Sequence, residues 1–242
     1  MPGGVYAALS GLQTRTERLD RIAEDISNAQ TPGYKGDRTT TIAADRPTFT
    51  DSLSAAVDVV LSKAKSDFRE GVVSASGRDL DFAIQGHGFF QIQTPGGLRY
   101  TRSGHFTKAP DGTITTTGGE PVLGEDGNPL ILPPGGTVSY ASDGTISVGS
   151  TTVGRPAVMT FKNLGQLIRE DGVRFKAPDT LTPEPATDSV VKPKMIEESN
   201  VLPQERMAQL VGASRSFDSL QRGISVLLND IDGRAITELG RR

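Results

Sequence analysis

Residues 200–242, NVLPQERMAQLVGASRSFDSLQRGISVLLNDIDGRAITELGRR, decide how this chain is organised. Within this stretch, apolar and small residues recur in steps of three and four, as in a helix that packs lengthwise on a second helix. These positions are Met207, Leu210, Ser214, Phe217, Gln221, Ile224, Leu228 and Ile231. Ser199-Asn200 offers an N-cap and Pro203 suits a first helical turn, so a helix is predicted to begin here.

The other end of the chain carries the same stepping. Its positions are Val5, Ala8, Leu12, Leu19, Ile22, Ile26 and Ala29, with Arg15 as one polar interruption. The helix is predicted to end before Thr31, because Pro32 disfavours helical backbone in the residue before it and Gly33 accepts a left-handed turn. We interpret the two sets of positions as helix seams.

Neither helix is expected to be stable alone. Burying about eight apolar side chains contributes roughly 10 to 20 kcal/mol, whereas ordering about 25 residues costs on the order of 25 to 50 kcal/mol of backbone entropy. Further apolar residues widen both stripes, namely Leu9, Ala23, Val211, Leu220 and Leu227. The width favours helices that become ordered when several subunits pack side by side. An intramolecular helical hairpin is the alternative for the same seams.

The middle of the chain has the period of β-strands. Leu80, Phe82 and Ile84 alternate with their neighbours. The run Phe89–Ile92 leads into the turn signal of residues 94–97, and residues 98–102 are predicted as the returning strand. The tetrapeptide Asp-Gly-Thr-Ile occurs at residues 111–114 and again at 143–146, which predicts two similar hairpins.

The predicted fold is mixed α and β. Its N- and C-terminal helices are expected to form a coiled-coil-like helical layer, and its central domain is expected to be antiparallel and β-rich. The predicted boundaries are residues 1–35 for the first helix, 36–66 for an extended connector, 67–176 for the β-rich domain, 177–198 for a Pro-rich connector and 199–242 for the last helix. Residues 51–65 carry a short amphipathic pattern that fits helix or strand.

Composition narrows the classes of function. The 242 residues carry a net charge of -3 with both signs interspersed, which argues against binding to nucleic acid or to anionic lipid. The sequence contains no Cys, so it forms no disulfide. It shows no run of eighteen apolar residues and no basic and then apolar N-terminus, which argues against membrane insertion and against a cleaved signal peptide.

Few residues suggest chemistry. Asp79 and Asp81 are spaced to share one strand face, but no further acid or base accompanies them, so a structural role is favoured. His87 and His105 are the only histidines, too few for a zinc site. The glycines around His87 lack the following helix of a phosphate-binding loop. No catalytic residue, cofactor or metal is therefore predicted.

Five motifs span nearly the whole chain, at residues 28–35, 80–90, 100–106, 198–201 and 213–217. In this order they resemble the signatures of the flagellar rod, hook and hook-associated proteins. The matching residues are Asn28, Thr31, Gly33, Tyr34, Lys35, Leu80, Asp81, Gly86, Gly88, Phe89, Phe90, Tyr100, Thr101, Arg102, Gly104, Phe106, Ser199, Asn200 and Val201. Tyr34 fits a core position or a subunit contact, whereas Phe217, on the seam, favours a contact.

The resemblance implies a structural subunit of the flagellar basal-body rod without enzymatic activity. In that family the terminal helices line a tube around the export channel, and the β-rich part forms the outer layer. The implied partners are further copies, other rod proteins and the flagellar type III export apparatus, with no nucleic acid or small-molecule substrate. The implied location is the rod in the periplasmic space, reached without a cleaved signal peptide.

Residues 129–133 and 153–155 are most similar to proximal rod proteins, and the distal rod proteins are the alternative. Residues 24–27 and His87 depart from the usual family pattern, which leaves the choice between rod proteins open. Two other hypotheses are a phage-tail-like tube component and a secreted β-rich hydrolase. The hydrolase would use Asp79, Asp81 or His105.

Overall fold

The computed structural model describes residues 2–38, 65–141 and 143–239. It divides into two compact units, which are treated separately. The helical unit comprises Met1–Ser27, Asp37–Lys65 and Leu202–Arg242, and the β-rich unit comprises Asn28–Gly36 and Ser66–Val201. Most of the amphipathic pattern over residues 51–65 lies outside the described residues, as do the side chains of the seam residues Val5, Ala8, Leu228 and Ile231.

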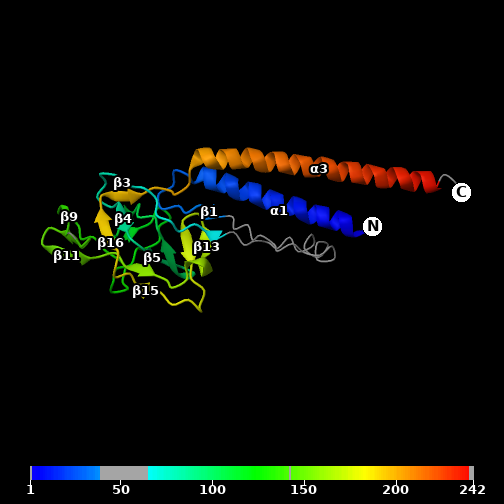
Figure 1. Cartoon of the computed structure of the whole chain (residues 1–242). Helices are drawn as coiled ribbons and strands as arrows, with labels where there is room; N and C mark the ends of the chain where they lie inside the picture. Colours follow the sequence, from blue (N-terminus) through cyan, green and yellow to red (C-terminus); the bar gives the residue numbers. More distant parts are fainter. Residues whose placement is uncertain (1, 39–64, 142, 240–242) are drawn as a thin grey trace. The chain divides into compact units, whose positions relative to one another are not determined.

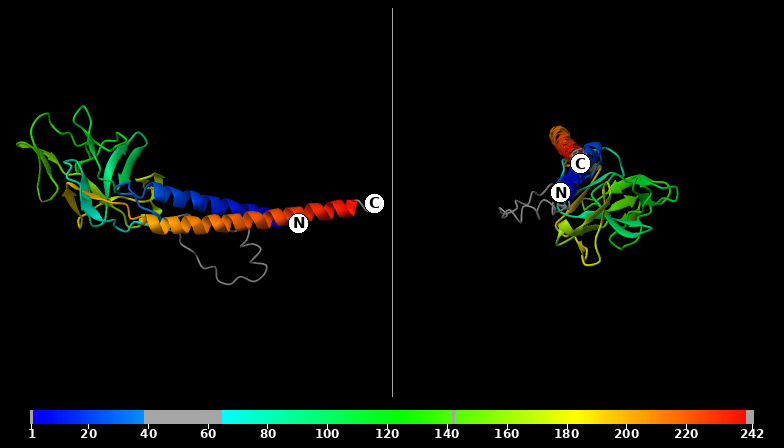
Figure 2. Two further views of the ribbon diagram at one scale, coloured as in Figure 1. Left: turned by 90° about the horizontal axis from the view of Figure 1, so that it is seen from above. Right: turned by 90° about the vertical axis from the view of Figure 1, so that its right-hand side faces the viewer.

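The helical unit contains two long helices, α1 (Pro2–Ser27) and α3 (Pro203–Leu239). They lie side by side and run antiparallel, with the N-terminus of α1 toward the C-terminal half of α3 (Figures 1 and 2). α3 begins at Pro203, whose missing N–H costs nothing in a first turn. α1 ends at Ser27, four residues before Thr31. The sequence predicted the end of α1 before Thr31 and the place of Pro203 in the first turn of α3. The predicted N-cap at Ser199-Asn200 is wrong, because α3 begins three residues later and the Asn200 side chain bonds other segments.

The expected coiled-coil-like helical layer is wrong. The described residues contain one pair of α-helices, and the remaining regular structure is almost entirely strand. On α3 the half-buried positions that form a single stripe are Arg206, Leu210, Ala213, Phe217, Leu220 and Ile224. The predicted seam residues Met207, Ser214 and Gln221 are exposed. A coiled coil buries both its a and its d positions. Here the predicted seam residues Leu210, Phe217 and Ile224 are half-buried, but those that alternate with them are not.

The seam residues of α1 are better covered. Ile22 is buried, and Leu12, Leu19 and Ile26 are half-buried.

An ion pair explains why only half of the predicted seam on α3 is covered. The Nε atom of Arg206 lies 3.0 Å from a carboxylate oxygen of Asp25, which is buried on α1. Arg206 also donates to the carbonyl of Asp37 at 2.7 Å, and the Asp37 N–H donates to Asp25 at 3.2 Å. This contact brings Arg206 rather than Met207 to the face toward α1. The seam prediction counted apolar positions only and therefore missed this rotation.

The β-rich unit is built from antiparallel pairs (Figure 1). Its largest sheet has six strands in the order β13 (Ile168–Asp171), β14 (Arg174–Lys176), β6 (Gly97–Thr101), β5 (Phe89–Thr94), β12 (Val158–Thr160) and β15 (Glu184–Pro185). A second sheet has the order β11 (Thr151–Gly154), β10 (Ile146–Val148) and β9 (Val138–Tyr140).

The other strands form short pairs. These are β16 (Val190–Pro193) with β4 (Phe82–Gln85), β17 (Met195–Glu197) with β3 (Val73–Ala75), and β7 (Thr107–Lys108) with β8 (Ile114–Thr115). The remaining short elements are β1 (Asp37–Arg38), β2 (Lys65–Ser66) and the 3-10 turn η1 (Leu164–Gln166).

The stretch 177–198, expected to be an extended connector, carries three of these strands. Val190–Pro193 pairs with β4, and Val191 is buried in the core. Pro185 lies on the edge strand β15 and Pro193 ends β16, positions where a missing backbone N–H is tolerated. The prolines therefore restrict this stretch to short strands at sheet edges, but they do not prevent strand formation.

The hairpin of β5 and β6 joins two hydrophobic clusters. Its tight turn lies between Thr94 and Gly97, which pair across it, as the sequence predicted. Successive side chains on a strand point to opposite faces. Accordingly Phe90 packs edge-on against Phe106 with ring centroids 5.2 Å apart, while Phe89 packs against Phe175 at 5.8 Å on the other side. Both faces of β5 are thus covered.

The repeated tetrapeptide forms the same turn twice. Asp111 accepts a hydrogen bond from the Thr113 N–H at 3.0 Å, and Asp143 accepts one from the Thr145 N–H at 3.0 Å. These bonds lower the pKa of both aspartates, because they favour the ionised carboxylate. The glycines that follow have φ of 92° and 87°, values that favour glycine. The predicted likeness of the two segments is confirmed.

Gly104 lies where the chain leaves no space for a side chain. A Cβ at this position would lie 1.7 Å from the carbonyl oxygen of Phe82, whose N–H donates to the Gly104 carbonyl at 2.9 Å. By contrast, Gly77 has φ of 73° with no atom within 4 Å of an added Cβ. Gly104 is therefore required for lack of space, whereas Gly77 is favoured only by its backbone conformation.

We predict that Gly104→Ala destabilises the β-rich unit by about 3 kcal/mol or more, because Phe82 on β4 must move away from residue 104. Gly77→Ala is the matched control and should cost about 1 to 2 kcal/mol, the left-handed backbone penalty alone. Urea unfolding followed by tyrosine fluorescence measures both. Equal losses in the two variants would contradict the steric account.

Candidate functional site

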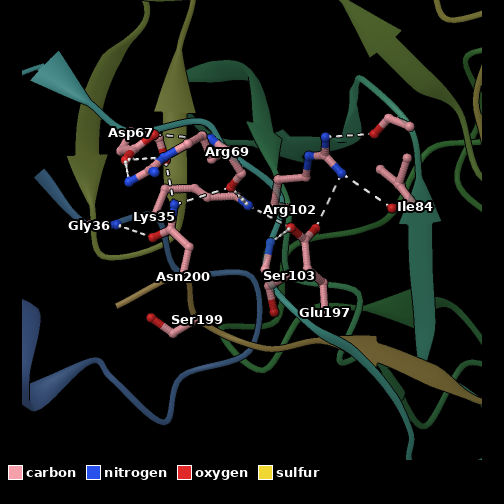
Figure 3. Close-up of polar contacts among 12 residues, drawn as sticks. Lys35, Gly36, Asp67, Arg69, Ile84, Arg102, Ser103, Glu197, Ser199 and Asn200 are labelled. Atoms are coloured by element: carbon pink, nitrogen blue, oxygen red, sulfur yellow. Dashed lines mark hydrogen bonds and ion pairs between the residues drawn. The ribbon is translucent and has the colours of Figure 1, made fainter. Parts of the chain in front are cut away.

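Segments far apart in the sequence meet around the carboxylate of Glu197 inside the β-rich unit (Figure 3). Lys35 comes from the first motif, Arg102 follows β6, and Glu197 ends β17. The side chains of Lys35, Glu197 and Arg102 are 0%, 1% and 3% exposed. Charged side chains are almost never buried without partners, so these contacts define a site.

Lys35 is held on two sides. Its Nζ atom donates to Oε1 of Glu197 at 2.5 Å and to the carbonyl of Arg69 at 2.7 Å. The same Oε1 accepts the N–H of Gly71 at 2.9 Å. Burial lowers the pKa of the Lys35 ammonium, and the carboxylate of Glu197 acts in the opposite direction. The carboxylate thus offsets the cost of burying the cation.

Arg102 occupies the other carboxylate oxygen. Its Nη1 atom donates to Oε2 of Glu197 at 3.2 Å and to the carbonyl of Ile84 at 3.3 Å. Its Nη2 atom donates to the carbonyl of Gly86 at 2.8 Å. The guanidinium carbon also lies 5.6 Å from the ring centre of Phe89. Arg102 therefore links the end of β17 to the motif at residues 80–90.

Asn200 lies beside this cluster and hydrogen-bonds to the backbone of other segments. Its Oδ1 atom accepts the N–H of Gly36 at 2.8 Å, and its Nδ2 atom donates to the carbonyls of Asp67 at 2.7 Å and Arg69 at 3.1 Å (Figure 3). An amide supplies an acceptor and two donors on one side chain. Asn200 therefore joins the backbone at Gly36 to that at residues 67–69, a role that needs both a donor and an acceptor on one side chain.

Gly33 must be glycine for two reasons. Its φ is 71°, and a Cβ would lie 2.2 Å from the backbone nitrogen of Ser103. Its N–H donates to the carbonyl of Glu197 at 2.7 Å. The first motif thus lies directly against the third motif and against Glu197, which precedes the fourth.

Tyr34, which the sequence left open, lies in the core with 1% of its surface exposed. The guanidinium carbon of Arg169 lies 4.7 Å from its ring centre, and Arg169 donates to the carbonyl of Lys35 and to Oγ of Ser66 at 3.0 Å. Arg169 lies on the edge strand β13. The stacked arginine covers the aromatic ring and a backbone carbonyl together.

The second and third motifs pair with each other. The Phe82 N–H donates to the Gly104 carbonyl at 2.9 Å, and the Phe106 N–H donates to the Leu80 carbonyl at 3.1 Å. Between these bonds, Asp81 and His105 face each other across an isolated bridge.

Other motif residues have local partners. Gly88 stands where a Cβ would lie 2.6 Å from Val158, and Gly86 has φ of 103°. Thr31 donates to Asn28 at 3.2 Å, Thr101 accepts the Ser103 N–H at 3.0 Å, and Ser199 accepts the Val201 N–H at 3.2 Å. Tyr100 is buried, with its ring centre 4.8 Å from that of Phe161, and burial raises the pKa of its hydroxyl.

The two aspartates of the hydrolase hypothesis have separate partners. Asp79 is exposed and lies 2.9 Å from Nζ of Lys194, and its carbonyl accepts the hydroxyl of Tyr140. Burial raises the pKa of Tyr140 to about 12. Asp81 is buried, with Oδ1 3.0 Å from Nδ1 of His105. The two carboxylates therefore serve different parts of the fold and form no shared site for acid and base.

The described ranges contain no group of three or more potential metal ligands. Within those ranges no helix is long and apolar enough to cross a membrane.

Sequence reasoning missed Glu197, Arg169 and Asp25, which stand beside the quoted motifs or outside them. No signal in the sequence identified Glu197, because the burial of Lys35 and Arg102 is seen only in the structure. A motif lysine and a motif arginine that are both buried require an anion between them.

The contacts of the cluster hold distant segments of the chain together. The family described as flagellar hook protein FlgE/F/G D1 domain has a sequence model that matches residues 83–148. The chain is 32% identical to flagellar basal-body rod protein FlgF of Caulobacter vibrioides over 225 residues, 92% of each protein.

It is 30% identical to FlgF of Rhizobium meliloti over 250 aligned residues, 99% of each protein. It is also 30% identical to flagellar basal-body rod protein FlgG of Bacillus subtilis over 240 residues, 89% of this chain and 91% of that protein. The chain therefore belongs to the family of flagellar basal-body rod and hook proteins.

We predict that Glu197→Gln destabilises the β-rich unit by about 3 to 5 kcal/mol, because Lys35 and Arg102 would remain buried without a counter-charge. Glu198→Gln is the matched control, because the side chain of Glu198 is exposed. This variant should change stability by less than about 0.5 kcal/mol. Urea unfolding at neutral pH compares the two. A Glu197→Gln variant as stable as the control would show that the ion cluster contributes little.

Proposed function

We propose that this chain is a structural subunit of the flagellar basal-body rod and that it stands in the proximal part of the rod. The relatives named FlgF support this assignment, because two of them match 92% and 99% of the chain at 30% identity or more. The relative named FlgG matches 89% of the chain at 30% identity. A place in the distal rod is therefore the second candidate.

The observation that carries the proposal is the outer surface of α3. Met207, Val211 and Val226 are 54%, 51% and 68% exposed on this helix. Apolar side chains at such positions gain free energy when a neighbouring molecule covers them. Contacts between unlike surfaces that do not close on themselves generate a helical assembly. Such an assembly would form the tube that transmits torque and encloses the export channel.

The partners that follow from this proposal are further copies of the chain, other rod proteins and the flagellar type III export apparatus. The rod would lie in the periplasmic space, and the chain would reach it without a cleaved signal peptide. The exposed positions of the predicted seam, Met207, Ser214 and Gln221, would then serve as a packing surface between subunits. The β-rich unit would form the outer layer of the tube.

We predict that Val211→Glu abolishes swimming of a strain that makes only this variant, because a charge replaces an apolar contact between subunits. The stability of the isolated chain should change by less than about 0.5 kcal/mol, since the side chain is half exposed. Val211→Ala is the control and should swim. Basal bodies that contain Val211→Glu at the normal amount would contradict a packing role for this face.

A second prediction concerns the isolated chain. Amide hydrogens of α3 should exchange at least about tenfold faster than those of β4 and β5, because the described part of α3 has no buried side chain while both strands are buried. Exchange read by mass spectrometry tests this. Equal protection of α3 and the strands in a dilute monomer would refute the view that neighbours are needed to cover the helix.

A further inference from the structure

A groove on one flank of the α1–α3 pair is lined by three arginines. Two adjoining cavities of about 470 and 390 Å³ form it, and they share Arg15 and Ser216. Arg215 lines the first cavity and Arg18 the second. The other lining residues are uncharged, namely Gln209, Gly212, Ala213, Ser219, Leu220 and Gly223. The groove therefore carries three positive charges and no negative one.

None of these guanidinium groups is neutralised within the part of the chain that the structure describes. Arg15, Arg18 and Arg215 make no ion pair and no side-chain hydrogen bond there, although Arg15 is half-buried. Neighbouring like charges repel one another. The planar fork of an arginine binds carboxylates with two parallel hydrogen bonds. The groove is thus suited to carboxylates from another molecule.

Small residues of α3 line the floor of the groove. Gly212, Ser216, Ser219 and Gly223 follow one another in steps of four, three and four, so they share one face of α3. A Cβ added at Gly212 or Gly223 would meet nothing within 4 Å. Small residues allow another helix to approach closely, because the distance between packed helices depends on the side chains at the contact.

The same helix pair carries an acidic surface elsewhere. Gln13, Glu17, Asp20 and Glu24 share one face of α1 by the same spacing, away from the buried Ile22. Asp20 is exposed and has no ion-pair or hydrogen-bond partner among the described side chains. Glu17 pairs with Arg21 at 3.7 Å on the surface. This face bears three carboxylates, one of them paired with Arg21, and is opposite in charge to the groove.

We propose that the arginine-lined groove binds the acidic face of α1 from a second copy of this chain. The inference rests on the proposed function as a rod subunit and names the contact between subunits. The groove and the acidic face are different surfaces, so the contact is heterologous and leaves one of each free on every copy. Exposed ion pairs add little affinity individually. They fix which faces meet and in which register.

The absence of Cys from the sequence allows a direct test. One copy carries Ser219→Cys in the groove and keeps all three arginines, and a second carries Gln13→Cys on the acidic face. Basal bodies are purified from a strain that makes both variants and are treated with a short bismaleimide. The expected product is a dimer that joins one copy of each variant. Neither variant alone should give a dimer, because the groove of one copy contacts the acidic face of another and only one of these two surfaces would carry a cysteine.

Charge reversal tests the arginines themselves. Arg18→Glu with Arg215→Glu in the groove copy should lower the cross-linked yield at least about tenfold, because carboxylates would then face carboxylates. Glu17→Arg with Asp20→Arg in the other copy should restore it. A control with the same change of charge, Lys108→Glu with Lys176→Glu in the β-rich unit, should leave the yield unchanged.

The outcomes separate this inference from the proposed function. If both cysteine variants are present in the basal bodies and no mixed dimer forms, the contact is refuted while the rod assignment stands. A dimer of one variant with itself, or a product with a different protein, also refutes it. If the chain is missing from purified basal bodies, the proposed function fails first. A yield that charge reversal does not lower would show that the arginines do not hold the contact.

Discussion

One carboxylate, that of Glu197, holds together parts of the β-rich unit that are far apart in the sequence. Lys35 lies 162 residues away from it and Arg102 lies 95 residues away. Without this anion two cations would stay in the interior with no counter-charge, which costs far more than an exposed ion pair contributes. The motif residues around Glu197 support this cluster. Gly33 lets the first motif lie against Ser103 and Glu197, and Asn200 hydrogen-bonds to the adjoining backbone.

Local physical rules allowed much of the fold to be predicted. The hairpin at residues 94–97 and the two Asp-Gly-Thr-Ile turns depend on glycine backbone freedom and on short side-chain hydrogen bonds, which the sequence displays directly. The ends of the two helices follow from proline and glycine placement. The motif residues could be named in advance because of the family resemblance, and the structure shows what their side chains contact.

The errors arose where a long-range polar contact overrides a local pattern. The ion pair of Arg206 with Asp25 sets the rotation of α3, and a pattern of apolar residues contains no information about it. Val191 is a core residue because β16 pairs with β4, which lies more than a hundred residues earlier in the sequence. The proline-rich composition around Val191 gives no indication of this pairing. Glu197 was missed because a buried anion cannot be recognised until its two cations are known to be buried.

The most direct test of the central claim is a double-mutant cycle between Lys35→Met and Glu197→Gln, measured by urea unfolding. If the carboxylate holds the buried cation, the double variant should be more stable than the sum of the single losses predicts, by at least about 2 kcal/mol. Additive losses, within about 0.5 kcal/mol, would contradict the account and show that the two side chains stabilise the fold independently.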